Sequence, residues 1–152
     1  MKKYSFTFII ALIIGFFLCY IFLKQYDSFE GIKVSSMGEK LYFIQYGVFS
    51  SLESLEENTI SLQNYIYNEQ DGLYYVYVGI TRLEENADKI VNYYKNLGYD
   101  TIIKQYEITN KKFINELINY DEILKNTNDT TVTSSITNQV LSKYEEVVIN
   151  GG

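Results

Sequence analysis

The chain contains no histidine, no proline and no tryptophan, and it has a single cysteine, Cys19. The lack of histidine excludes a Ser-His-Asp triad and a Cys-His pair, and the usual zinc sites are excluded as well. A single cysteine also excludes a disulfide within the chain. We therefore expect no metal, no other cofactor and none of these catalytic mechanisms.

Positive charge is also scarce beyond the N-terminus. After Lys2 and Lys3, 11 basic and 19 acidic residues remain, which leaves this part of the chain with a net charge of −8. A surface with this balance repels polyanions. Nucleic acid, teichoic acids and anionic lipid head groups are therefore not expected as partners.

Residues 6–23 form an uncharged apolar run of 18 residues, FTFIIALIIGFFLCYIFL. As a helix this run measures about 27 Å, close to the thickness of the hydrocarbon core of a bilayer. The lysines within residues 1–5 place the N-terminus in the cytoplasm and the remainder outside the cell membrane. A cleaved signal peptide is the alternative, but no small-x-small cleavage site follows the run. We predict a retained single-pass transmembrane helix, then a linker at residues 24–40.

Two stretches of the chain share one design at an offset of 32 positions, which aligns Ile44 with Val76 and Gly47 with Gly79. Each stretch runs into a capping-box pattern, at residues 50–53 and 81–84, and then into a helical period. Short strands are expected near residues 65–67 and 101–106. The order β-α-β-β-α-β predicts an α+β, ferredoxin-like fold, in which two helices cover one face of a four-stranded antiparallel sheet. The other face is expected to be open.

Strict alternation along the two main strands divides their residues between these faces. Ile44, Tyr46 and Val48 are expected under the helices, together with Val76 and Val78. The open face is then expected to carry Phe43, Gln45, Gly47, Tyr75, Tyr77 and Gly79.

The pattern Gln45-x-Gly47-x-Phe49-Ser50-Ser51, the strand 75–79 and the later Glu84-Glu85-x-Ala87 resemble the SPOR (sporulation-related repeat) domain over roughly residues 41–108. The resemblance implies the βαββαβ fold and binding of septal peptidoglycan, in particular of glycan strands stripped of stem peptides. It also agrees with a single membrane helix. The chain departs from the family at residues 79–81, where Gly-Ile-Thr replaces the usual Gly-Pro-Phe. Tyrosines also occupy the preceding strand, where an arginine is common.

The resemblance implies that the glycan lies on the open sheet face, and Gln45 matches the family's strand-one glutamine. Tyrosine suits a sugar because it offers a stacking surface with a polar tip, and glutamine is both donor and acceptor. Glycine lets a polymer approach the backbone. The six open-face residues are therefore the expected glycan-binding site. The alternative is that the aromatic residues form cross-strand pairs that another element covers.

Residues 109–152 lie beyond the resemblance. Apolar periodicity predicts helices near 109–125 and 136–148, separated by a polar loop at 126–135. Their apolar stripes are expected to pack on the domain or on a partner. The paired acids Glu56-Glu57, Glu84-Glu85 and Glu145-Glu146 fall on polar faces or at helix starts, so a hydrolase is not expected.

Taken together, the sequence predicts a membrane-anchored, non-catalytic peptidoglycan-binding protein that acts at a division or sporulation septum. Its expected partners are glycan strands, the cell membrane and proteins of the division or sporulation machinery. The alternative is a protein–protein interaction module of that machinery, in which the C-terminal helices cover the sheet.

Overall fold

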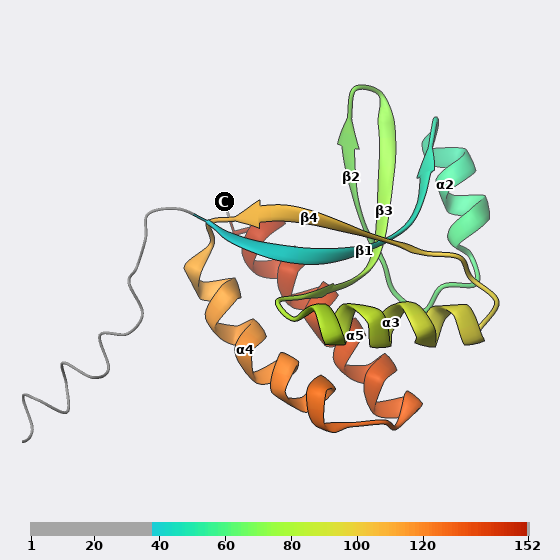
Figure 1. Ribbon diagram of the computed structural model, residues 1–152. Coiled ribbons are helices and arrows are strands. Elements are labelled where there is room, and N and C mark those ends of the chain that lie inside the picture. The colour runs from blue at the N-terminus through green and yellow to red at the C-terminus, as the bar shows by residue number, and fades with distance from the viewer. Residues whose placement is uncertain (1–37, 152) are drawn as a thin grey trace, which may run out of the picture. The chain divides into compact units, whose positions relative to one another are not determined.

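The computed structural model describes residues 38–151, which form a four-stranded antiparallel sheet with helices packed against it (Figure 1). The elements are β1 (Glu39–Phe49), α2 (Leu52–Thr59), β2 (Ile66–Gln70), β3 (Leu73–Thr81), α3 (Glu84–Asn96), β4 (Ile102–Ile108), α4 (Lys111–Asn126), α5 (Thr130–Tyr144) and a terminal π-helical turn, η1 (Glu145–Ile149). The strands lie in the order β2-β3-β1-β4. The expected β-α-β-β-α-β order and the antiparallel sheet are therefore confirmed.

The N-terminal predictions fall mainly on residues without a description in the structure. The predicted cytoplasmic residues 1–5, the transmembrane helix at 6–23 and most of the linker lie outside residues 38–151. Among the residues that the structure describes, no helix combines the length and apolar character needed to cross a membrane. Strand β1 begins at Glu39, inside the stretch predicted as linker.

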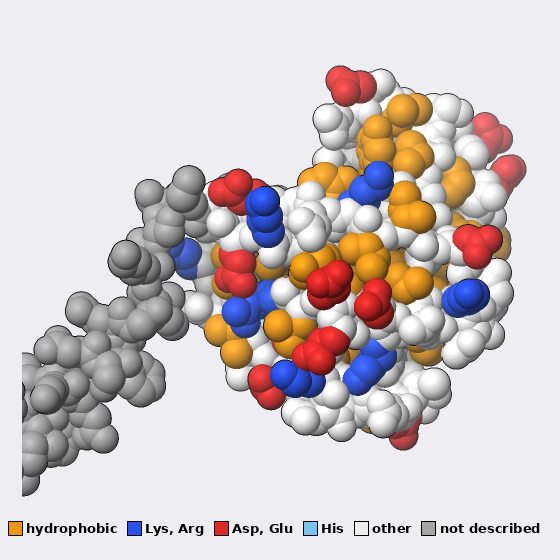
Figure 2. Space-filling model, viewed as in Figure 1, with side chains coloured by type: hydrophobic (Ala, Val, Ile, Leu, Met, Phe, Trp, Pro, Cys, Tyr) orange, Lys and Arg blue, Asp and Glu red, His pale blue; other side chains and the backbone are white. Residues whose placement is uncertain are grey.

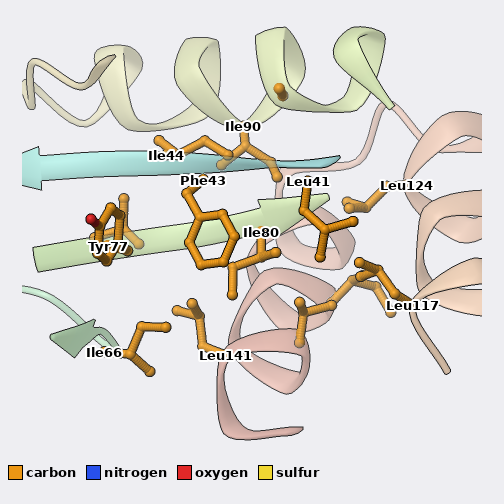
Figure 3. Close-up of a cluster of buried hydrophobic side chains, with 14 of the residues drawn as sticks. Leu41, Phe43, Ile44, Ile66, Tyr77, Ile80, Ile90, Leu117, Leu124 and Leu141 are labelled. Atoms are coloured by element: carbon orange, nitrogen blue, oxygen red, sulfur yellow. The ribbon is translucent and has the colours of Figure 1, made fainter. Parts of the chain in front are cut away.

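The sheet has a packed layer on each face, and Figure 3 shows both. Ile44 points toward Ile90 of α3 on one face. On the other face Leu41, Phe43 and Ile80 point toward α4 and α5, where Leu117, Leu124 and Leu141 are fully buried. The expectation that the second face is open is therefore wrong, because the C-terminal extension covers much of it. Residues 38–151 accordingly belong to one compact unit.

Strand β1 does not alternate strictly, because its pairing with β3 shifts register between Ile44 and Gln45 and again between Gln45 and Gly47. Directly opposed residues share a face, and a bulge exchanges the faces of the residues beyond it. Gly47 is opposite Val76, and Val48 is opposite Tyr75. The prediction that Val48 lies under the helices is therefore wrong, and its side chain is 41% exposed.

Neither capping box forms as predicted. The N-cap of α2 is Ser51, whose side chain accepts a hydrogen bond from the Ser54 N–H at 3.1 Å. At α3 the N-cap is Leu83, and the buried hydroxyl of Thr81 instead donates to Asp121 of α4. The second box does not form because α3 begins only at Glu84, and the Thr81 hydroxyl accepts from the Leu83 N–H at 3.2 Å, ahead of the helix.

Polar contacts fasten α4 to the end of β3 and to α3. Asp121 is 2% exposed, and besides Thr81 its carboxylate accepts from the backbone N–H of Arg82 at 3.1 Å. The ammonium group of Lys89 donates to the carbonyl oxygens of Leu124 and Thr127, at 2.5 and 2.7 Å, where α4 ends. A cation at the last carbonyl groups of a helix satisfies acceptors that have no partner within the helix.

Helix α5 begins earlier than the sequence indicated. Asp129 is its N-cap and accepts from the backbone N–H groups of Thr131 and Val132 at 2.7 and 3.3 Å. Most of the predicted polar loop at 126–135 is therefore helical. A serine- and threonine-rich surface becomes a rigid helix face as a result.

Candidate functional site

A pocket of about 320 Å³ crosses the sheet face beside the end of α5. We call it the sheet-face groove. Its lining includes residues from all four strands, namely Phe43 of β1, Ile66 and Asn68 of β2, Tyr77 of β3, and Tyr106 and Ile108 of β4. Tyr144 of α5 and Ile149 of η1 complete it on the side of the extension, while Tyr67 and Glu107 lie at the two edge strands. Its volume lies at the lower end of the range for small-ligand sites.

The floor of the sheet-face groove is a set of aromatic rings around Phe43. The ring centroid of Phe43 lies 5.4 Å from that of Tyr77, 5.2 Å from that of Tyr106 and 5.5 Å from that of Tyr144. All three contacts are edge-to-face, an arrangement that aromatic rings favour. The rings therefore hold one another in fixed orientations before any ligand binds.

The phenol groups supply the polar part of the floor. The hydroxyl oxygens of Tyr77 and Tyr106 lie 2.7 Å apart in a hydrogen bond. Burial raises the pKa of Tyr77 well above its ordinary value, and the hydrogen bond to Tyr106 raises it further. Burial also raises the pKa of Tyr144. Tyr77 and Tyr144 are therefore neutral at physiological pH and remain able to donate hydrogen bonds.

Exposure separates the residues that build the floor from those that a ligand can reach. Phe43 and Tyr77 are 3% and 6% exposed, whereas Tyr106 is 38% exposed. Glu107, at the edge, accepts a hydrogen bond from the Gly38 N–H through Oε1 at 2.8 Å. A ligand in the groove would therefore meet the Tyr106 ring first, with carboxylate and amide groups at the two edges.

Four of the six predicted site residues share this face of the sheet. Phe43 and Tyr77 line the groove, and Gln45 lies directly opposite Tyr77. Tyr75 is half-buried on the same face, opposite Val48. Gln45 is 6% exposed, and its Oε1 atom has no hydrogen-bond partner among residues 38–151.

The two glycines lie on the other face, and the expectation that they share the face of Phe43 is wrong. A Cβ atom at Gly79 would lie 3.0 Å from Ile90 Cγ2 and 3.4 Å from Ile44 Cδ1. At Gly47 it would lie 2.8 Å from the ring of Phe49. The register shifts in β1 and β3 are the cause. Gly79 thus allows α3 to approach the sheet.

Sequence reasoning missed Tyr106, Tyr144, Asn68 and Ile149 as groove residues. Tyr106 lies in an expected strand, opposite Leu41, and alternation would have placed it once that register was known. Tyr144 and Ile149 gave no signal, because an apolar stripe does not indicate which surface it will cover. The three acid pairs considered for hydrolysis are exposed and absent from the groove lining.

Comparisons with known proteins found one similar solved structure. No family model and no curated protein matches the chain. The chain is similar to the solution structure of the peptidoglycan binding domain of the B. subtilis cell wall lytic enzyme CwlC, with 32% sequence identity and a TM-score of 0.40. The match covers 98% of that domain and 49% of this chain. About half of this chain therefore has no counterpart in that domain.

Proposed function

We propose that the protein is a non-catalytic module that binds the glycan strands of peptidoglycan in the sheet-face groove. The observation that carries this proposal is the floor of edge-to-face rings with the linked phenols of Tyr77 and Tyr106. The resemblance of residues 41–108 to the SPOR domain supports it. So does the 32% identity to a domain whose name states that it binds peptidoglycan.

The chemistry of the groove suits a sugar ring. Such a ring has an apolar CH face, which packs on an exposed aromatic ring such as Tyr106, and a rim of hydroxyl groups. In the Tyr77–Tyr106 pair one phenol donates to the other, which leaves the second O–H free to donate to a ligand. Asn68 adds an amide that both donates and accepts, and Glu107 adds a carboxylate acceptor.

The cellular setting is part of the proposal and is supported by the sequence. The apolar run at residues 6–23 would anchor the protein in the cell membrane with its C-terminal part outside. The linker that follows would reach about 20–25 Å as a flexible chain, which keeps the groove near the membrane. The resemblance to septal proteins favours action at a division or sporulation septum.

The test is co-sedimentation of the full chain, in a mild detergent, with purified sacculi before and after amidase treatment. The protein should bind treated sacculi more strongly, because amidase removes stem peptides from the glycan. Tyr106→Ala should lower the affinity about tenfold, a loss of about 1.4 kcal/mol. Tyr42→Ala is the matched control, since Tyr42 is a half-buried tyrosine of the same sheet outside the groove lining. Equal, weak binding to both preparations would count against the proposal.

A protein–protein interaction module remains the second candidate, and the covered sheet favours it. Because α4 and α5 bury the centre of this face, less of it is left for a polymer. Helix α4 also presents Ile118 and Ile123 to solvent, at 37% and 45% exposure. If this candidate is correct, Ile118→Asp with Ile123→Asp should abolish cross-links to a partner in intact cells and leave sacculus binding unchanged.

A further inference from the structure

A second groove lies on a different part of the molecule, between α3 and the first half of α5. Its volume is about 590 Å³, within the range of ligand sites. We call it the α3–α5 groove. Its lining includes Gln63, Tyr93, Asn96, Ser134, Ser135 and Asn138, together with Leu97 and two threonines at the start of α5.

The α3–α5 groove has no charged residue in its lining. This is unusual on a protein in which 21% of residues are charged and in which acidic and basic side chains are scattered over the face seen in Figure 2. Residues 126–142 include a single charged side chain, Asp129. Its carboxylate already accepts hydrogen bonds from backbone N–H groups at the start of α5. The groove therefore offers hydroxyl and amide groups without a field that would attract an ion.

Hydrogen bonds hold the polar floor in place. Gln63 Oε1 accepts from Ser134 Oγ at 2.9 Å and from Asn138 Nδ2 at 3.3 Å. Asn64, next in the chain, donates through Nδ2 to the backbone carbonyl of Asn138 at 3.1 Å. These bonds fix the side chains from two segments that are distant in the sequence. The amide nitrogen of Gln63 and the amide oxygen of Asn138 face no hydrogen-bond partner among the described residues, so both can serve a ligand.

One aromatic ring completes the composition. Tyr93 is half-buried and packs edge-to-face on Tyr94, with ring centroids 5.1 Å apart. The backbone carbonyl of Val78 accepts a hydrogen bond from the buried Tyr94 hydroxyl at 3.2 Å, which anchors the pair. A fixed aromatic ring beside amides and hydroxyls matches a ligand with an apolar ring face and a hydroxylated rim.

The exposed residues of α5 near the groove are not the ones that would make this helix most stable. Thr130, Thr131 and Ser135 are exposed on α5. Serine and threonine form helices less well than alanine, glutamate or lysine, by roughly half a kcal/mol each. Exposed helix positions with poorer helix formers than packing requires are often sites with another role.

We propose that the α3–α5 groove binds N-acetylated sugar units of a polysaccharide and forms a second glycan contact. The proposal rests on the proposed function in that both grooves would bind the same polymer. The chemical argument is its own, because the groove combines amide donors and acceptors, hydroxyl groups and one ring without charge. Acetamido groups would pair with Gln63 and Asn138, and a sugar face would pack on Tyr93.

The test uses tetra-N-acetylchitotetraose and the full chain, labelled with ¹⁵N, in detergent. Amide signals of residues 93–97 and 130–138 should shift on titration. Ser135→Lys places a long charged side chain at an exposed position of the groove. It should raise the dissociation constant, as measured from these signals, about threefold or more. Gln139→Lys is the matched control. Gln139 is outside the groove lining and is the partner of Ser135 in a 3.1 Å hydrogen bond, so both variants lose that bond.

The results separate this inference from the proposed function. If signals at 93–97 and 130–138 stay in place, or if both lysine variants bind alike, the α3–α5 groove is only a solvated helix surface. If Tyr106→Ala abolishes binding to sacculi while Ser135→Lys leaves it unchanged, the inference is wrong and the proposed function stands. If the α3–α5 signals shift while sacculus binding does not depend on Tyr106, the inference stands and the sheet-face site is wrong.

Discussion

The ring of Tyr144, close to the end of the chain, packs edge-to-face on Phe43 of β1, with centroids 5.5 Å apart. The same ring lies 5.1 Å from Phe113 of α4. One tyrosine therefore joins the sheet, α4 and α5, and it also forms a wall of the sheet-face groove. The C-terminal extension is thus part of the core and part of the candidate site.

Loss of the Tyr144 ring should destabilise the protein. Tyr144→Ala removes two aromatic contacts and leaves a cavity, so we expect the free energy of unfolding to fall by about 2–4 kcal/mol. Tyr144→Phe keeps the ring and should cost less than about 1 kcal/mol. Urea unfolding followed by circular dichroism measures both. If Tyr144→Ala changes stability no more than Tyr144→Phe does, α5 is not packed on the sheet as described.

Asp121 should make stability depend on pH. Burial raises the pKa of this carboxyl, although hydrogen bonds from Thr81, Arg82 and Asn86 oppose the shift. Because the folded pKa is above the unfolded one, stability should fall as pH rises from about 4, the ordinary aspartate value, through the raised folded value, and then level off. Urea midpoints measured between pH 4 and 7 should show this decline in the wild type. Asp121→Asn should remove it, and an identical pH profile in the variant would contradict this assignment.

Lys89 should stabilise the junction between α3 and α4. Lys89→Met keeps the aliphatic stem but leaves the carbonyl groups at the end of α4 without their cation, at an expected cost of about 1–3 kcal/mol. Lys95→Met, at an exposed position of the same helix, is the control and should cost less than about 1 kcal/mol. Thermal unfolding of both variants gives the comparison. Equal losses would mean that the contacts of Lys89 with α4 do not matter to stability.

Gly79 should matter for the packing of α3 on the sheet and not for ligand binding. Gly79→Ala would press a methyl group against Ile90, which should cost about 1–3 kcal/mol of stability. Because Gly79 is on the face away from the sheet-face groove, sacculus affinity below the melting transition should stay the same. A large loss of affinity with little loss of stability would contradict this prediction and would mean that Gly79 belongs to the glycan site.

The order of the first six elements could be predicted because β1, β3 and α3 have strong periodic signals, and capping and turn signals mark the shorter elements between them. The stripe that includes Ile90 and Tyr94 marks α3, and Gly98, with φ of +88°, follows its end as expected. Phe43 and Tyr77 could be assigned to one face because each precedes the irregularity in its own strand, where the alternation of faces is still regular. These shifts leave no periodic signal in the sequence, so Val48, Gly47 and Gly79 were placed on the wrong faces.

The rest of the site depends on packing between distant segments. Apolar stripes in α4 and α5 predicted that these helices bury a face, but not which surface they cover. The start of α5 was missed because serine and threonine favour turns and caps as readily as helices. Tyr144 could therefore not be assigned to the groove before the arrangement of the extension was known.

The most direct test of the central claim observes the tyrosine rings during binding. The full chain, with ¹³C in its tyrosine rings, would be titrated with soluble glycan fragments from amidase-treated peptidoglycan, and signals would be assigned with single Tyr→Phe variants. The account predicts that the rings of Tyr106, Tyr77 and Tyr144 shift together, while that of Tyr42, outside the groove lining, does not. Binding that leaves the signals of Tyr106, Tyr77 and Tyr144 unchanged would contradict it.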